Sequence, residues 1–134
     1  MNSQNRDFDK EAATWDENPG RVKMANNVAN TILDAISLKN TMKVLDFGCG
    51  TGLLTLRLQP FVASITAVDS SAGMLEVLNR KIESQNITNI TTEHLDIAPF
   101  YLVSNQRSKK QVINLKRYQC NPIIIPLIAL TGLQ

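Results

Sequence analysis

The sequence predicts an α/β protein built on a parallel sheet, and two observations support this prediction. Short runs rich in apolar and β-branched residues have the length and composition of strands, at 42–47, 64–68 and 90–95. Segments with helical spacing of apolar residues lie before and between these runs, at 20–37, 53–59 and 74–82. Strands that alternate with helices form parallel sheets through right-handed crossovers. The chain has 134 residues, enough for one ordinary domain.

The first predicted helix covers residues 20–37. Asn18 followed by Pro19 is typical of a helix start, because Asn accepts hydrogen bonds from free backbone amides and Pro fits the first turn. Its apolar residues recur at three- and four-residue steps and predict one core-facing stripe, formed by Met24, Ala25, Val28, Ala29, Ile32, Leu33 and Ile36. Residues 1–17 precede this helix, and we expect them to form a loosely ordered arm.

Each predicted strand ends in a polar or glycine-rich segment. The first strand runs into Gly48-Cys49-Gly50-Thr51-Gly52, and a helix follows at 53–59 until Pro60 ends it. The second strand ends at Asp69, and Ser70 or Ser71 caps a helix whose core face holds Met74, Leu75, Leu78 and Ile82. The third strand ends at Asp96.

The alternation of strands and helices stops after Ala98. Residues 99–134 hold five Lys and Arg and no acid, whereas residues 1–98 hold nine basic and twelve acidic residues. The last segment contains a strand-like stretch at 112–115 and an apolar run at 123–130 that Pro126 interrupts. The sequence therefore predicts three parts: an arm at 1–17, an α/β unit at 18–98, and a basic, apolar tail at 99–134 of undefined structure.

Charge and cysteine content limit the partners and the cellular location that the sequence predicts. The formal net charge of +2 is too small to predict a nucleic-acid or membrane partner. Two cysteines make no disulfide framework or metal-ligand pattern, and the polar N-terminus lacks the apolar core of a secretion signal. We therefore expect a cytoplasmic protein without a bound metal.

The predicted ligand site lies beyond the carboxyl ends of the strands, where parallel sheets bind their ligands. Gly48, Gly50 and Gly52 allow a tight turn and close approach of a ligand to the backbone. Asp46 directly before this turn would repel a pyrophosphate, and residues 44–56 contain no Lys or Arg to offset this charge. A ligand that carries an ammonium, a sulfonium and a small carboxylate suits the site better.

Two further acids predict a nucleoside at the same edge of the sheet. Asp69, 17 residues after Gly52, has the place of a carboxylate that accepts both ribose hydroxyls. Asp96 has the chemistry to accept from an adenine amine, with Ile97 as an apolar surface for the ring. Structural explanations compete with each assignment: a plain strand-to-helix turn at the glycines, a helix-capping acid at Asp69 and a turn residue at Asp96.

These residues resemble a known family. The segment from Val44 to Gly52 matches the cofactor motif of class I S-adenosylmethionine-dependent methyltransferases, and the segment from Ile65 to Leu75 looks like their second motif. An N-terminal pattern, Phe8-Asp9 with Ala13 and Trp15-Asp16, is similar to small-molecule methyltransferases of the ubiquinone and menaquinone biosynthesis type. The resemblance implies a Rossmann-like fold and an S-adenosyl-L-methionine site formed by Asp46, Gly48, Cys49, Gly50, Thr51, Gly52, Asp69, Ser70, Met74, Asp96 and Ile97.

The resemblance covers residues 8–98. Members of the family continue past the Asp96 position into a fourth strand and the acceptor pocket, and the tail contains nothing recognisable of either. We expect this chain to represent the cofactor-binding half, with catalytic residues unidentified and little or no activity, as truncation, a frameshift or alternative splicing would produce. The tail is expected either to pair along the open edge of the half sheet or to promote aggregation.

Two other functions remain open at this level. One is a non-catalytic fragment that binds the cofactor, or another chain through its incomplete sheet. The other is a nicotinamide-dependent oxidoreductase, which the acid before the turn and Leu53 after Gly52 disfavour.

Overall fold

The structure is a computed structural model that describes residues 7–96 and 122–126. Its elements, in chain order, are α1 (Phe8–Glu11), the 3-10 turn η1 (Ala12–Glu17), α2 (Pro19–Ala35), β1 (Lys43–Phe47), α3 (Leu53–Leu58), the 3-10 turn η2 (Gln59–Phe61), β2 (Ser64–Asp69), α4 (Ala72–Ser84), β3 (Ile90–His94) and β4 (Pro122–Pro126).

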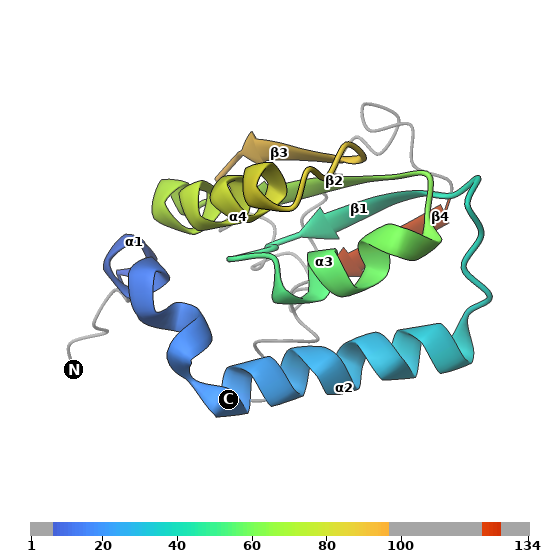
Figure 1. Ribbon diagram of the computed structural model, residues 1–134, viewed down its shortest axis with the longest axis horizontal. Helices are drawn as coiled ribbons and strands as arrows, with labels where there is room; N and C mark the ends of the chain where they lie inside the picture. The colour runs from blue at the N-terminus through green and yellow to red at the C-terminus, as the bar shows by residue number, and fades with distance from the viewer. Residues whose placement is uncertain (1–6, 97–121, 127–134) are drawn as a thin grey trace, which may run out of the picture.

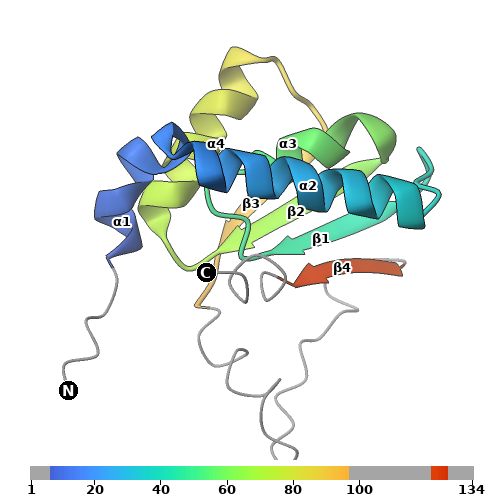
Figure 2. The same ribbon diagram turned by 90° about the horizontal axis from the view of Figure 1, so that it is seen from below.

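The strands form one parallel sheet in the order β3-β2-β1-β4. The register aligns Val44 with Ile65 and Ile65 with Ile90, so apolar residues of three strands form one row. Helices α2, α3 and α4 lie on the same face of this sheet, with α2 beside α3 (Figures 1 and 2). The prediction of an α/β protein with a parallel sheet is confirmed.

Strand β4 is a correction to the predicted three-strand sheet. Pro122–Pro126 lies beside β1, with Lys43 opposite Pro122 and Phe47 opposite Pro126. Proline has no backbone N–H to donate to the hydrogen-bond ladder of a sheet, so the two prolines argue against a strand in this run. Both prolines lie at the ends of an edge strand, however, where they are tolerated. Residues 122–126 of the tail therefore pair along the edge of β1, which is one of the two behaviours expected of the tail. The strand-like stretch at 112–115 lies outside the described residues.

The N-terminal segment, residues 8–17, is a second correction. The sequence predicts a loosely ordered arm, but the segment forms α1 and η1. Asp7 caps α1 by accepting from the Lys10 amide at 3.2 Å. A helix of one turn is not stable alone, so contacts with the rest of the fold, described below, hold this segment in place.

Helix α2 begins as predicted and ends slightly earlier. The Asn18 side chain accepts from the Gly20 and Arg21 amides at 2.9 and 3.4 Å, and Pro19 is the first helical residue. Ala25 and Ala29 are buried, whereas Ile36 lies beyond the helix and is exposed. In residues 7–96 and 122–126, no helix combines the length and apolar character needed to cross a membrane.

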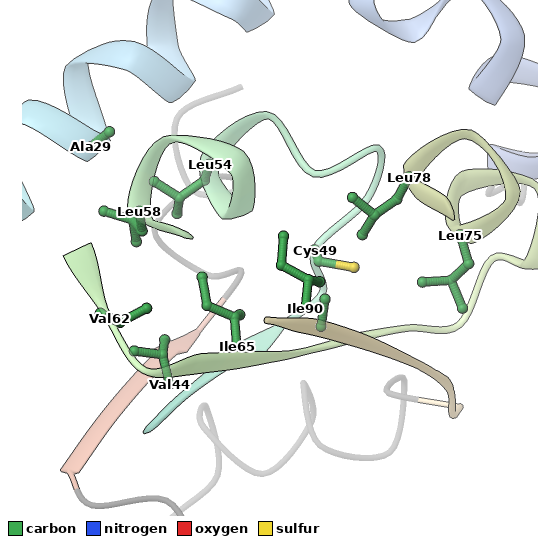
Figure 3. Close-up of a cluster of buried hydrophobic side chains, with 11 residues drawn as sticks. Ala29, Val44, Cys49, Leu54, Leu58, Val62, Ile65, Leu75, Leu78 and Ile90 are labelled. Carbon is green, nitrogen blue, oxygen red and sulfur yellow. The ribbon is translucent and has the colours of Figure 1, made fainter. Parts of the chain in front are cut away.

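The main core lies between the sheet and its helices (Figure 3). Val44, Ile65 and Ile90 point from the strands toward Leu54 and Leu58 of α3 and Leu75 and Leu78 of α4, and all of these side chains are buried. The Cys49 side chain lies between the strands and Leu78, at the centre of the cluster (Figure 3). The turn that follows β1 therefore packs against the core through the Cys49 side chain.

Candidate functional site

The glycine turn, residues 48–52, connects β1 to α3 and has the backbone that its sequence requires. Gly48, Gly50 and Gly52 have φ angles of 84°, 57° and 83°, which other residues adopt only at a cost. The Gly48 and Cys49 amides donate to the Val68 carbonyl at 2.6 and 3.0 Å, which anchors the turn to the end of β2. The predicted tight turn is confirmed, and it lies at the carboxyl end of the sheet.

Asp69 connects the glycine turn to the segment after β2. Its Oδ2 accepts from the Gly50 amide at 2.8 Å, and its Oδ1 accepts from the Ser71 amide at 2.8 Å. Burial raises the pKa of this carboxyl, while the backbone amides that donate to it act in the opposite direction. An ionised carboxylate has about four acceptor positions. The two bonds therefore leave Asp69 able to accept further donors from a ligand.

Asp46 lies on the helix side of β1, with 2% of its surface exposed. The Thr55 hydroxyl of α3 donates to its Oδ2 at 2.5 Å. Burial raises the pKa of Asp46 to about 6, and the nearby Asp69 acts in the same direction, whereas the Thr55 bond opposes both. The structure thus places Asp46 behind the turn and against α3, where it contacts Thr55 directly.

The other predicted site residues divide into buried, exposed and undescribed positions. Cys49, Thr51 and Met74 are buried, and burial raises the pKa of the Cys49 thiol. Ser70 is exposed beside Asp69, and Asp96 is exposed just after β3. Ile97 lies outside the described residues. The structure therefore brings the glycine turn, Asp69 and Ser70 together, and places Asp96 beyond the end of the next strand.

Asp16 of η1 contacts the glycine turn, a contact that residue spacing did not predict. Its Oδ1 accepts from the Thr51 hydroxyl at 2.6 Å, and its Oδ2 pairs with the Lys81 ammonium at 2.5 Å. Lys81 of α4 also donates to the Thr51 carbonyl at 2.9 Å. Asp16, Thr51 and Lys81 thus form a closed network over the turn.

Asp9 of α1 makes the second such contact. Its Oδ1 accepts from the Ser71 hydroxyl at 2.5 Å and from the Gly73 amide at 2.8 Å, at the start of α4. These hydrogen bonds lower the pKa of Asp9, the Ser71 bond contributing most. Both acids belong to the N-terminal pattern of the family resemblance, which was the only signal for them in the sequence.

The chain is similar to known methyltransferases. A family model described as a methyltransferase domain matches residues 44–114. Malonyl-[acyl-carrier protein] O-methyltransferase of Acetivibrio thermocellus is 37% identical over 84 residues, which are 60% of this chain and 29% of that protein. Ubiquinone biosynthesis O-methyltransferase of Actinobacillus pleuropneumoniae is 33% identical over 85 residues, 60% of this chain and 36% of that protein.

The chain is also similar to a relative named for ribosomal RNA and to a solved structure with the same fold. Ribosomal RNA small subunit methyltransferase A of Mesomycoplasma hyopneumoniae is 29% identical over 103 residues, 76% of this chain and 38% of that protein. The crystal structure of a SAM-dependent methyltransferase from Aquifex aeolicus has the same fold, with a TM-score of 0.55 and 22% identity, over 66% of this chain and 47% of that one. The chain spans 29 to 38% of the length of the three curated relatives.

Proposed function

The chain belongs to the methyltransferase-domain family, and from this premise we propose that the glycine turn and Asp69 bind S-adenosyl-L-methionine for transfer of its methyl group. The observation that carries the proposal is the place of Asp69. It lies at the end of the strand next to the glycine turn, bonded to the backbone on both sides, with acceptor positions left for two ribose hydroxyls.

The surroundings of Gly50 support the same proposal. A Cβ atom at Gly50 would meet no atom within 4 Å, so the turn leaves open space at this point. A ligand can approach the backbone there without meeting a side chain, and the methionine part of the cofactor is expected in this place. Asp46 contributes negative charge from behind the turn, at a distance and not by contact, because Thr55 and the surrounding core cover it.

The chemistry proposed for the site requires little from protein side chains. The methyl group on a sulfonium is already activated, so in-line transfer depends on proximity and orientation of the two reactants. Residues that would hold the acceptor are not identified among those described, and we propose that this chain by itself transfers methyl groups slowly or not at all. Asp96 and Ile97 stay predictions for the adenine contact.

We favour a small-molecule acceptor over nucleic acid. Two of the relatives are named as O-methyltransferases of malonyl-[acyl-carrier protein] and of ubiquinone biosynthesis, whereas another is named for ribosomal RNA. The net charge of the whole chain, +2, is too small to favour binding of a phosphate backbone. A cytoplasmic location and association with another chain stay predictions.

Calorimetric titration tests the cofactor assignment. We expect the chain to bind S-adenosylhomocysteine and not NAD, and Asp69→Ala to weaken binding by about 100-fold, because two charge-assisted hydrogen bonds to the ligand are lost. Asp69→Asn, which keeps one oxygen acceptor, should weaken it less. Glu76→Ala is the matched control, since this exposed acid of α4 pairs with Arg80 on the same helix.

The outcomes separate the competing functions. Binding of NAD in preference to S-adenosylhomocysteine would reject the proposal and favour the oxidoreductase. Association with another chain that Asp69→Ala leaves intact would indicate the non-catalytic fragment. Equal binding by wild type and Asp69→Ala would remove Asp69 from the site.

A further inference from the structure

We propose that Asp9 and Asp16 are positioning residues of the cofactor site, which hold the glycine turn and the start of α4 at the spacing that the cofactor requires. This inference rests on the proposed function and deepens it. It starts from the N-terminal segment, residues 8–17, whose two acids reach two different parts of the site.

Asp16 fixes the glycine turn from the outside. Its carboxylate accepts from the Thr51 hydroxyl and pairs with Lys81, and Lys81 closes the network on the Thr51 carbonyl. The Asp16 and Lys81 side chains are only 32% and 22% exposed, and the Thr51 side chain is buried. Partial burial strengthens such charge-assisted bonds relative to an exposed ion pair. The turn is therefore held both to η1 and to α4.

Asp9 fixes the start of α4. It accepts from the Ser71 hydroxyl and the Gly73 amide, at the helix end where a negative charge is favourable. The fit is close, because a Cβ atom built at Gly73 would lie 2.9 Å from the Asp9 Cα and from the Asp9 carbonyl oxygen. Glycine at position 73 thus allows the backbone of α1 to approach α4.

Both contacts converge on Asp69. The Gly50 amide, which donates to Asp69 Oδ2, immediately precedes Thr51, the partner of Asp16. The Ser71 amide, which donates to Asp69 Oδ1, belongs to the residue whose hydroxyl donates to Asp9. Release of either acid of the N-terminal segment therefore loosens one of the two backbone donors that orient the Asp69 carboxylate.

The N-terminal segment is itself anchored on α2, so it can transmit this restraint. The Arg21 guanidinium of α2 stacks on the Trp15 ring, 3.6 Å from its centroid, and Arg21 also pairs with Glu11 at 3.6 Å. The Trp15 ring in turn contacts Phe8, with ring centroids 5.9 Å apart. One side of the segment is thus fixed to α2, while Asp9 and Asp16 on the other side hold the site.

The test measures S-adenosylhomocysteine affinity of the 134-residue chain by calorimetry, at a temperature where every variant is folded. We expect Asp9→Ala and Asp16→Ala each to raise Kd by about tenfold, because each loses a pair of bonds that orient the site. Asp9→Asn, which keeps an oxygen for Ser71 and Gly73, should restore most of the affinity. Gly73→Ala should weaken binding as Asp9→Ala does, because it displaces α1 while keeping every acid.

Glu17→Ala is the matched control. It removes an exposed acid of η1 directly next to Asp16 and should leave Kd unchanged. Faster amide exchange at Gly50 and Ser71 in ligand-free Asp16→Ala and Asp9→Ala would support the inference independently of ligand. Unchanged Kd in both Ala variants, even with lowered thermal stability, would overturn it. No binding by the wild type would overturn the proposed function and this inference together.

Discussion

Alanine substitutions at Gly52 and Gly50 separate backbone strain from packing in the glycine turn. Both residues have left-handed backbone, with φ angles of 83° and 57°. A Cβ atom at Gly52 would lie 2.3 Å from the Leu78 Cδ1, inside the core, whereas one at Gly50 would meet nothing within 4 Å. The two substitutions therefore share the strain and differ in the steric clash.

The size of each effect follows from these contacts. Left-handed backbone costs a non-glycine residue about 1 to 2 kcal/mol, which is the whole expected effect of Gly50→Ala. Gly52→Ala adds the cost of overpacking against Leu78, about 1 to 3 kcal/mol, for a total of about 2 to 5 kcal/mol. Urea unfolding followed by circular dichroism measures both free energies.

We expect the opposite order for ligand binding, with Gly50→Ala weakening it more than Gly52→Ala. Gly50→Ala places a methyl group in the space proposed for the cofactor, so we expect it to weaken S-adenosylhomocysteine binding although it is the more stable variant. Leu78→Ala provides the test of the clash, since it removes the atom that a methyl group at position 52 would meet. The double variant Gly52→Ala/Leu78→Ala should lose at least about 1 kcal/mol less than the sum of the single variants. Equal stability losses at positions 50 and 52, or additive losses in the double variant, would refute the reasoning.

Two further predictions concern stability. The pKa of Asp46 is raised from 3.8 to about 6 in the folded protein, so its contribution to the free energy of unfolding is fully present below about pH 4 and is lost as the pH rises through 6, a change on the order of 3 kcal/mol. Asp46→Asn should therefore reduce the fall in stability between pH 4 and 8, measured by urea unfolding, and an unchanged pH dependence would contradict the assignment. Asn18→Ala should cost about 1 kcal/mol through loss of the cap of α2, whereas Asn27→Ala at an exposed position of that helix should cost nothing; similar melting temperatures for the two variants would show that the cap is not stabilising.

Local patterns were sufficient for the central part of the fold. The strands at 43–47, 64–69 and 90–94 lie within a residue or two of the predicted runs, because buried β-branched segments between turns have few other conformations open to them. The glycine turn was predictable for the same reason, since three glycines at alternate positions allow backbone angles that other residues avoid. The positions of Asp46 and Asp69 at strand ends followed from these strands.

Other features depend on partners far away in the chain. The segment 8–17 has too few residues for a stable isolated helix, and its order comes from Asp9 and Asp16, which bond residues 62 and 35 positions away. Strand β4 forms because the edge of β1 is open to pairing, and the prolines of β4 are tolerated because they lie at the ends of this edge strand.

The sequence by itself determined the α/β class, the glycine turn and the acid at the end of β2, because each depends on residues that are neighbours in the chain. Only the tertiary structure decided that Asp46 is covered by Thr55 and that the N-terminal segment contacts the site through Asp9 and Asp16. The physical reason is that a carboxylate accepts a hydrogen bond from whichever donor the packing of helices and strands brings close enough. The spacing of residues along the chain does not predict which donor that is.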